Sequence, residues 1–284
     1  MLLVRKVLIF LVLLAGMLAP AAAQPQHYTW QGVQREYLMF EPAGREGAVP
    51  LMFFLHGLGD NITRCAEEMQ FDSLATRYGW VIVVPQALKV RGSTMWNAGL
   101  GGTADDGGFL MGLLDSLVNV GRVNADSVFC TGFSMGGFMT HRMAIEYGDR
   151  ITACAPVSGL ISYALAEDVP LEPVRVMHIH GTSDEVVGWN GGSAYFGNIG
   201  ISVDSLTFFW IGWNNCSGTA TVDSLPDRMN DGLRFVRHTY RGGDAEFQLL
   251  EVIGGRHDWY RDETEHDVDY FDVIHRFFIR DDGR

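Results

Sequence analysis

Short apolar segments alternate with longer segments of helical character along most of the chain. The short segments end at glycine, proline or polar residues, which is typical of buried strands. Strands are expected at residues 37–40, 51–55, 80–84, 128–131, 152–157, 174–180, 234–240 and 247–253. Helices are expected at residues 66–78, 107–120, 138–147, 204–213 and 265–279. Because strands alternate with helices, the pattern predicts an α/β fold with a mostly parallel central sheet and helices on both faces.

A glycine-rich turn joins one expected strand to a helix and carries a serine, in Gly132-Phe133-Ser134-Met135-Gly136. The pattern G-x-S-x-G between a strand and a helix is that of a nucleophile elbow, in which small residues avoid collisions inside a strained turn. Such a turn lifts the Ser134 hydroxyl clear of the sheet edge. The same motif also occurs in glycine-rich turns without catalysis, so its meaning depends on whether the serine has partners.

A serine becomes a nucleophile when a base, usually a histidine held by a carboxylate, takes its proton. Among the nine histidines, His257 is the best candidate, because it follows the strand at 247–253 and a Gly-Gly breaker. Loops at the carboxyl ends of strands are where α/β sheets place functional groups. His178 and His180 alternate within one strand. They are interpreted as packing residues rather than zinc ligands, because no third ligand stands at a recognisable spacing.

The acid of such a triad lies between the serine and the histidine in the hydrolase chain order. Asp184 fits this order, because it follows the strand at 174–180 in a short turn. The adjacent Asp258 is a poorer candidate, since neighbouring residues rarely reach each other's ring nitrogen in the required geometry. An aspartate at this position can also cap a turn without any catalytic role. The order predicts Ser134, Asp184 and His257 as the catalytic residues.

Two backbone N–H groups are expected to stabilise the negative charge that develops on the substrate oxygen. One is the N–H of Met135, directly after the candidate nucleophile. The second is expected from the loop after the strand at 51–55, where Gly57 lets the backbone turn and Leu58 is the candidate donor. His56 in the same loop is expected to brace it by hydrogen bonding.

Five segments occur in an order that is similar to a known family: Leu55-His56-Gly57, Gly132-Phe133-Ser134-Met135-Gly136-Gly137, Ala155-Pro156-Val157-Ser158-Gly159, His180-Gly181-Thr182-Ser183-Asp184 and Gly254-Gly255-Arg256-His257-Asp258-Trp259. Together they resemble the polyhydroxybutyrate depolymerase/feruloyl esterase branch of the α/β hydrolases, also called carbohydrate esterase family one. The resemblance implies an α/β-hydrolase fold and a serine esterase with a triad of Ser134, Asp184 and His257.

The substrate implied by the resemblance is an ester of plant polysaccharide or a polyester. Departures from the family's usual pattern at Leu58, Arg256 and Tyr260-Arg261 border the cleft, so they bear on the substrate. Aromatic rings in the surrounding loops can stack on sugars or phenolic acyl groups, although they can also pack under loops. Four substrate contacts are predicted: Trp96, Trp189, Trp259 and Tyr260. Feruloyl or acetyl esters of polysaccharide are predicted over polyhydroxybutyrate.

A non-catalytic binding protein on the same scaffold is the competing class of function. Such a protein should have lost one triad residue, and this chain retains candidates for all three. No cofactor and no metal ion is expected. The net charge of −13 argues against nucleic acid and anionic membranes as partners.

The N-terminus has the pattern of a secretory signal peptide. Two basic residues precede an apolar stretch at 7–18, and Ala21-Ala22-Ala23 offers a cleavage site. The apolar stretch is too short for a comfortable membrane span. Residues 1–23 are therefore predicted to be removed from a secreted protein, extracellular or periplasmic, and residues 24–284 to form a single esterase domain.

Four cysteines are present, and two of them, Cys130 and Cys154, fall in expected central strands, where buried thiols are ordinary. Cys65 and Cys216 lie nearer the ends of elements. A disulfide between these two stays open at this point, because sequence does not fix connectivity.

Overall fold

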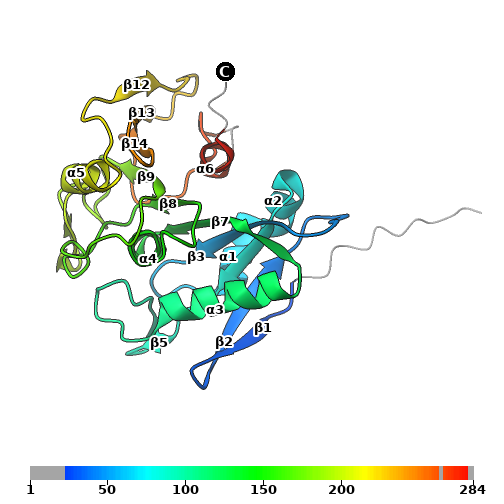
Figure 1. The fold of residues 1–284 in the computed structure, drawn as a ribbon. Helices are drawn as coiled ribbons and strands as arrows, with labels where there is room; N and C mark the ends of the chain where they lie inside the picture. The colour runs from blue at the N-terminus through cyan, green and yellow to red at the C-terminus, as the bar shows by residue number, and fades with distance from the viewer. Residues whose placement is uncertain (1–22, 262–264, 281–284) are drawn as a thin grey trace, which may run out of the picture.

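The structure is a computed structural model that describes residues 23–261 and 265–280. Its main sheet has the strand order β1-β2-β4-β3-β7-β8-β9-β14-β13-β12 (Figure 1). The bounds are Gln26–Trp30 (β1), Val33–Phe40 (β2), Val49–Leu55 (β3), Val81–Pro85 (β4), Val123–Phe133 (β7), Ala153–Val157 (β8), Arg175–Gly181 (β9), Thr221–Ser224 (β12), Arg234–Tyr240 (β13) and Phe247–Ile253 (β14). Two small hairpins stand apart, Lys89–Val90 (β5) with Ser93–Thr94 (β6) and Gly192–Ser193 (β10) with Gly197–Asn198 (β11).

The centre of the sheet is parallel, and both edges are antiparallel. Strands β4, β3, β7, β8, β9 and β14 pair in parallel, whereas β1 and β2 at one edge and β13 and β12 at the other pair antiparallel. Strands β4 and β9 are buried at every position. They lack a polar face because helices cover both sides of the sheet. The predicted mostly parallel sheet is confirmed.

The helices of the described residues divide between the two faces of the sheet. Their bounds are Ile62–Met69 (α1), Phe71–Tyr78 (α2), Asp106–Asn119 (α3), Met135–Glu146 (α4), Val203–Trp213 (α5) and Tyr270–Ile279 (α6). Helices α3, α4 and α5 share one apolar cluster with the sheet, and α1, α2 and α6 share a second cluster on the opposite face (Figure 1). The parallel strands β3, β7, β9 and β14 end at one edge, so the loops that follow them meet there.

Two predicted helices have different bounds in the structure. The helix expected at 66–78 is two helices, because Gln70 adopts a left-handed conformation with φ of 53° and ends α1. The last helix begins at Tyr270 rather than at 265, because the Asp269 carboxylate caps it and accepts a hydrogen bond from the N–H of Phe271. Apolar periodicity continues through both of these points, so it does not reveal them. The edge strands β1 and β12 were not predicted either.

The cysteines are all free, and no disulfide joins Cys65 to Cys216. Cys65 is buried in the cluster that contains α1, α2 and α6. Cys216 packs against the cluster on the opposite face of the sheet. The sheet therefore separates the two thiols, which excludes the pairing that the sequence left open.

The predicted signal peptide at residues 1–23 lies outside the described residues except for its last position. In the part of the chain that the structure describes, no helix has the length and apolar character needed to span a membrane.

A buried ion pair joins β2 to the first turn of α3. The Arg35 guanidinium lies 2.7 Å from the Asp106 carboxylate, and both side chains are almost fully buried. The second oxygen of Asp106 accepts a hydrogen bond from the N–H of Asn97. The guanidinium also lies over the ring of Phe109. Both charges are thus compensated inside the protein, which buried charges require.

We expect Asp106→Asn to lower the free energy of unfolding by about 3 kcal/mol or more, because it leaves the Arg35 charge buried without its counter-ion. The matched control is Asp115→Asn on the same helix, which removes an exposed ion pair with Arg150. The control is expected to change stability by less than about 1 kcal/mol. Urea unfolding of both variants measures the difference, and equal losses would contradict the role of burial.

Candidate active site

The glycine-rich turn forms a strained elbow between β7 and α4. Ser134 adopts φ of 56° and ψ of −118°, a conformation that residues other than glycine rarely take. Its N–H donates to the carbonyl of Val157 on β8, and its own carbonyl accepts from the N–H of Phe138. The surrounding structure holds the strained backbone by these two bonds.

Glycines flank the elbow because the backbone leaves no room for side chains. A Cβ atom at Gly136 would stand 1.8 Å from the carbonyl oxygen of Leu55, at the end of β3. A Cβ at Gly132 would stand 2.6 Å from the backbone of Gly136. The steric reason that the sequence motif implies therefore holds for this chain.

The histidine loop and the acid turn are bound to each other. The N–H of Ser183 donates to the carbonyl of Gly255, and the N–H of Gly254 donates to the hydroxyl of Thr182. Gly181 must be a glycine there, because a Cβ would stand 2.3 Å from the carbonyl oxygen of Gly255. These contacts bring the ends of β9 and β14 together.

His257 forms a hydrogen-bonded pair with Asp184. The distance from His257 Nδ1 to Asp184 Oδ2 is 2.8 Å. The other carboxylate oxygen, Oδ1, accepts from the N–H groups of Val186 and Val187. The Asp184 side chain is fully buried, so this set of donors compensates its charge. The alternative acid, Asp258, accepts from the N–H of Trp259 instead.

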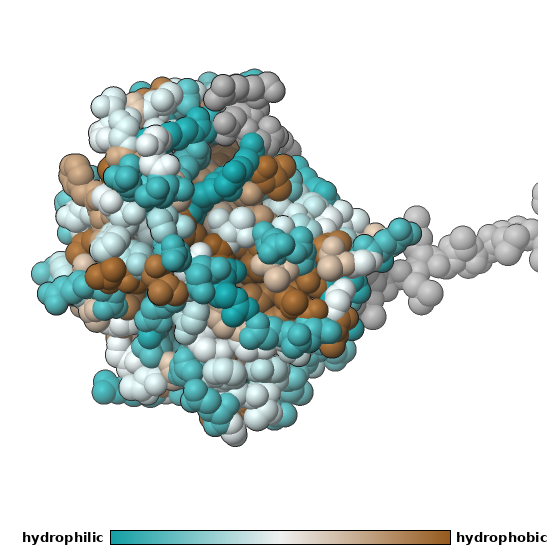
Figure 2. Space-filling view, viewed as in Figure 1, coloured by the Kyte–Doolittle hydropathy of each residue, from teal (hydrophilic) through white to brown (hydrophobic). Residues whose placement is uncertain are grey.

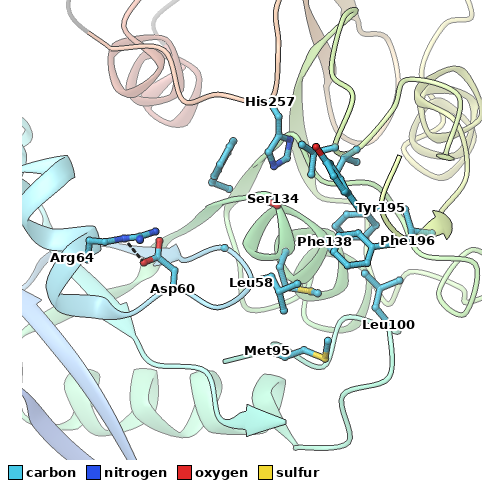
Figure 3. Close-up of a pocket in the computed structure, with 16 residues that line it drawn as sticks. Leu58, Asp60, Arg64, Met95, Leu100, Ser134, Phe138, Tyr195, Phe196 and His257 are labelled. Atoms are coloured by element: carbon cyan, nitrogen blue, oxygen red, sulfur yellow. Dashed lines mark ion pairs between the residues drawn. The ribbon is translucent and has the colours of Figure 1, made fainter. Parts of the chain in front are cut away.

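One pocket of about 810 Å³ brings the candidate residues together. Ser134 and His257 both line it, and Figure 3 shows the His257 ring pointing toward Ser134. Met135 and Leu58 line the same pocket. Met135 is the first residue of α4, so its N–H has no acceptor within the helix and is available to a ligand. The structure thus groups the predicted nucleophile, base and oxyanion donors.

His56 braces the loop that carries Leu58, as predicted. Its Nε2 accepts from the side chain of Gln86 and from the N–H of Ala87, and its Nδ1 lies 2.7 Å from the carbonyl of Gly57. Burial lowers the pKa of His56, which favours the neutral ring that this set of partners needs.

None of the four predicted substrate aromatics lines this pocket. Trp96 is fully buried and donates to the carbonyl of His56, so it supports the loop from beneath. Trp259 and Tyr260 are also buried, and the hydroxyl of Tyr260 accepts from the N–H of Arg256. Trp189 faces a separate depression and donates to Asp204. The structure thus places none of the four predicted substrate contacts in the pocket of Ser134 and His257: Trp96, Trp259 and Tyr260 are buried, and Trp189 lies elsewhere.

The exposed aromatic residues that line the pocket are Tyr195 and Phe196. They lie in the turn of the β10–β11 hairpin, and Figure 3 shows them near Phe138, across the pocket from Arg64. The pocket is also lined by the charged residues Asp60 and Arg64 and by a larger apolar set: Met95, Leu100, Phe133, Phe138, Val186, Val187 and Ile199. The sequence signal for the hairpin was its glycine-rich stretch at 188–200, which fixes neither its fold nor its direction.

The described residues contain no cluster of three or more histidine, cysteine, aspartate or glutamate side chains arranged to hold a metal ion. His178 and His180 are both buried in the core. Each contacts other side chains of the interior rather than an open ligand site, which agrees with the packing role predicted for them.

Residues 36–190, more than half of the chain, match the family model described as "Esterase PHB depolymerase". The chain belongs to this esterase family. The match contains the elbow and Asp184, and His257 lies beyond it in the chain.

Curated proteins include further relatives of this esterase-family chain. A probable feruloyl esterase C of Aspergillus clavatus is 30% identical over 232 residues, which cover 78% of this chain and 75% of that protein. The bifunctional acetylxylan esterase/xylanase XynS20E of Neocallimastix patriciarum is 27% identical over 159 residues, or 56% of this chain. The matched region spans only 23% of that bifunctional protein's length.

The fold of this family member is also found in solved structures. An acetyl xylan esterase from Aspergillus awamori superposes with a TM-score of 0.63, covering 90% of this chain and 98% of that one. The identity is 16%, so this likeness concerns the fold alone. It confirms the predicted α/β-hydrolase fold.

We expect Gly136→Ala to destabilise the protein by at least about 3 kcal/mol, because the new methyl group overlaps the backbone of β3 and cannot move away. The matched control is Gly212→Ala near the end of α5, where a Cβ meets nothing within 4 Å. The control is expected to stabilise by roughly 0.5 to 1 kcal/mol, since alanine loses less entropy than glycine in a helix. Thermal or urea unfolding measures both, and a harmless Gly136→Ala change would refute the close approach.

Proposed function

We propose that this chain is a serine carboxylic ester hydrolase that works through an acyl-enzyme intermediate. The observation that carries this proposal is the pocket itself. Ser134 on its strained elbow and His257, bound to Asp184, both open onto one cavity. Membership of the esterase family supports the same conclusion.

In the proposed reaction, the Ser134 hydroxyl attacks the ester carbonyl while His257 takes its proton. Asp184 holds the His257 ring through Nδ1 and stabilises the positive charge that the ring acquires. The N–H groups of Met135 and Leu58 are proposed to stabilise the oxyanion. His257 then gives the proton to the departing alcohol, and water hydrolyses the acyl-enzyme by the same route.

The proposed substrate class is carbohydrate-linked esters, feruloyl or acetyl. Relatives named as a feruloyl esterase and an acetylxylan esterase support this class. The pocket supports it as well, because the rings of Tyr195 and Phe196 provide flat apolar surface beside the serine, which suits an aromatic acyl group. The net charge of −13 favours a neutral ligand over an anionic one.

A polyester such as polyhydroxybutyrate is the second candidate substrate, and one observation favours it. Leu58, Tyr195 and Phe196 on the pocket rim have exposed fractions of 38%, 72% and 60%, so the entrance presents apolar surface to a polymer. On the face drawn in Figure 2, hydrophobic residues form separate patches among hydrophilic ones. A non-catalytic binding protein is less well supported, because the three candidate catalytic residues are all in place.

We further propose that residues 1–23 act as a signal peptide and that the remaining residues form one secreted esterase domain. The basic, apolar and small-residue pattern of the N-terminus supports the first part. One ten-stranded main sheet, with strands from β1 to β14, supports the second.

We expect Ser134→Ala to lower kcat by roughly 10⁴-fold or more on a soluble phenyl ester, because the nucleophile is lost while the fold remains. The wild-type protein should be labelled by a fluorophosphonate probe, and the variant should not. Ser116→Ala on the surface of α3 is the matched control and should retain labelling and activity. Hydrolysis by Ser134→Ala near the wild-type rate would refute the assignment.

Phe196→Ala tests whether the hairpin aromatics contact a feruloyl group, and a comparison of polymers separates the two substrate classes. It removes ring surface that a feruloyl group would contact, and loss of one such aromatic contact is expected to raise KM for a feruloyl ester about 10-fold, with a smaller change for an acetyl ester. The wild-type protein should release ferulate or acetate from arabinoxylan. If it clears a polyhydroxybutyrate suspension and releases neither acid, a polyester replaces the carbohydrate-linked ester as the proposed substrate.

A further inference from the structure

Three buried histidines form a continuous chain of hydrogen bonds beneath the candidate active site. His141 Nε2 lies 3.2 Å from His178 Nδ1, and His178 Nε2 lies 3.1 Å from His180 Nδ1. At one end of the chain, Trp210 Nε1 donates to His141 Nδ1 over 3.3 Å. At the other end, His180 Nε2 lies 2.8 Å from the carbonyl oxygen of Val187. All three imidazoles are fully buried.

The two ends fix the direction of every hydrogen bond between them. The indole N–H of Trp210 can only donate, so Nδ1 of His141 must accept. The Val187 carbonyl can only accept, so Nε2 of His180 must donate. Each ring therefore accepts at Nδ1 and donates at Nε2, which is the neutral tautomer protonated on Nε2. A second proton on any ring would sit on Nδ1, where it would face the N–H group that already donates to that nitrogen.

The charged surroundings agree with neutral rings. Burial is the largest influence on each of the three histidines and lowers the pKa in every case, for His141 to about 3. The neighbouring imidazoles act in the same direction, as does His257 on His180. Asp184 and the Val187 carbonyl raise the pKa of His180, and the Gly159 carbonyl raises that of His141, without overcoming burial.

The hydrogen-bonded histidine chain ends on the turn that holds the proposed catalytic acid. Val187 accepts from His180 through its carbonyl and donates its own N–H to Asp184 Oδ1, over 2.8 Å in each case. Asp184 Oδ2 remains free for His257 Nδ1. His180 Nε2 itself lies 3.7 Å from Asp184 Oδ2, too far for a hydrogen bond. The hydrogen-bonded connection from His180 to the acid therefore runs through Val187.

The other end of the histidine chain lies on α4, the helix that follows the proposed nucleophile. His141 lies on α4, seven residues or about two turns after Ser134, which caps that helix. His178 and His180 lie on β9, and Asp184 follows β9 directly. The chain thus ties the helix that carries the serine to the turn that carries the acid, across the interior of the protein.

We infer that His141, His178 and His180 are positioning residues for the reaction, which hold the Asp184–Val187 turn so that one carboxylate oxygen faces His257. Aliphatic side chains would fill the same interior and keep the sheet packed. They would leave the Val187 carbonyl without a donor, and the turn would lose the bond that holds it against β9. The inference rests on the proposed function of Ser134, Asp184 and His257.

The first test uses nitrogen NMR of the wild-type protein with labelled histidines. The three rings are expected to be neutral and protonated on Nε2 from about pH 5.5 to about pH 8.5, a range in which an ordinary histidine titrates. The proton on His257 Nδ1 should give a separate downfield signal, because Asp184 holds it. A ring of the chain protonated on Nδ1 or on both nitrogens would overturn the inference, and this result does not depend on catalysis.

The second test is His178→Phe, which removes the N–H that donates to His180 Nδ1, so that nothing fixes the tautomer in which His180 donates to the Val187 carbonyl. We expect kcat to fall roughly 10- to 100-fold, because small misplacements of catalytic groups lower the rate by such factors. KM should change less than about 2-fold. The downfield His257 signal should weaken through exchange with water. Met143→Ala, a fully buried change on the same helix that leaves the chain intact, is the control for lost stability.

The two variants are compared at temperatures equally far below their midpoints of unfolding. Loss of kcat by His178→Phe no greater than that of Met143→Ala, or an unchanged His257 signal, would overturn the positioning role. If His178→Phe does not fold, the tautomers measured by NMR in the wild-type protein test the inference on their own. A wild-type protein with no esterase activity and no fluorophosphonate labelling would refute the proposed function instead, so the two failures are distinguishable.

Discussion

The rest of the site depends on one constraint: the backbone at the start of α4 lies in direct contact with the backbone at the ends of β3 and β8. A Cβ at Gly136 would stand 1.8 Å from the carbonyl oxygen of Leu55, and one at Gly159 would stand 2.4 Å from the N–H nitrogen of Phe138. The helix is therefore wedged between the ends of β3 and β8, with no side chain between them. This contact fixes the strained conformation of Ser134, and it sets the distance of the helix N-terminus from the loops at the same sheet edge.

The buried carboxylate of Asp184 imposes a second requirement, because a charge in the interior must be compensated from several sides. Two backbone N–H groups satisfy one oxygen, and His257 satisfies the other. Behind the turn, the histidine chain supplies polar contacts without adding a net charge that would compete with His257 for the acid. The Asp184 carboxylate is thus held by hydrogen bonds, and neutral hydrogen bonds fix the turn behind it.

The pocket combines a rigid polar wall with an adaptable apolar one. Ser134 and Met135 stand at the start of α4, which packs against one face of the sheet, and His257 stands in a loop that is hydrogen-bonded to the turn after β9. Tyr195 and Phe196 stand on a short hairpin and are largely exposed. Sequence changes in this hairpin can therefore alter the lining of the pocket without disturbing the fold.

The sequence by itself determined the parallel sheet, the elbow and the order of the candidate triad. Those features follow from local rules: apolar runs form strands, only glycine fits beside the elbow, and functional groups follow strand ends. It did not determine the left-handed break at Gln70, the burial of Trp96, or the aromatic pair at 195–196. Aromatic character alone does not tell whether a ring faces a ligand or supports a loop. Only the tertiary structure decided these points, and the alignment of His141 with β9, because each depends on contacts between segments distant in the chain.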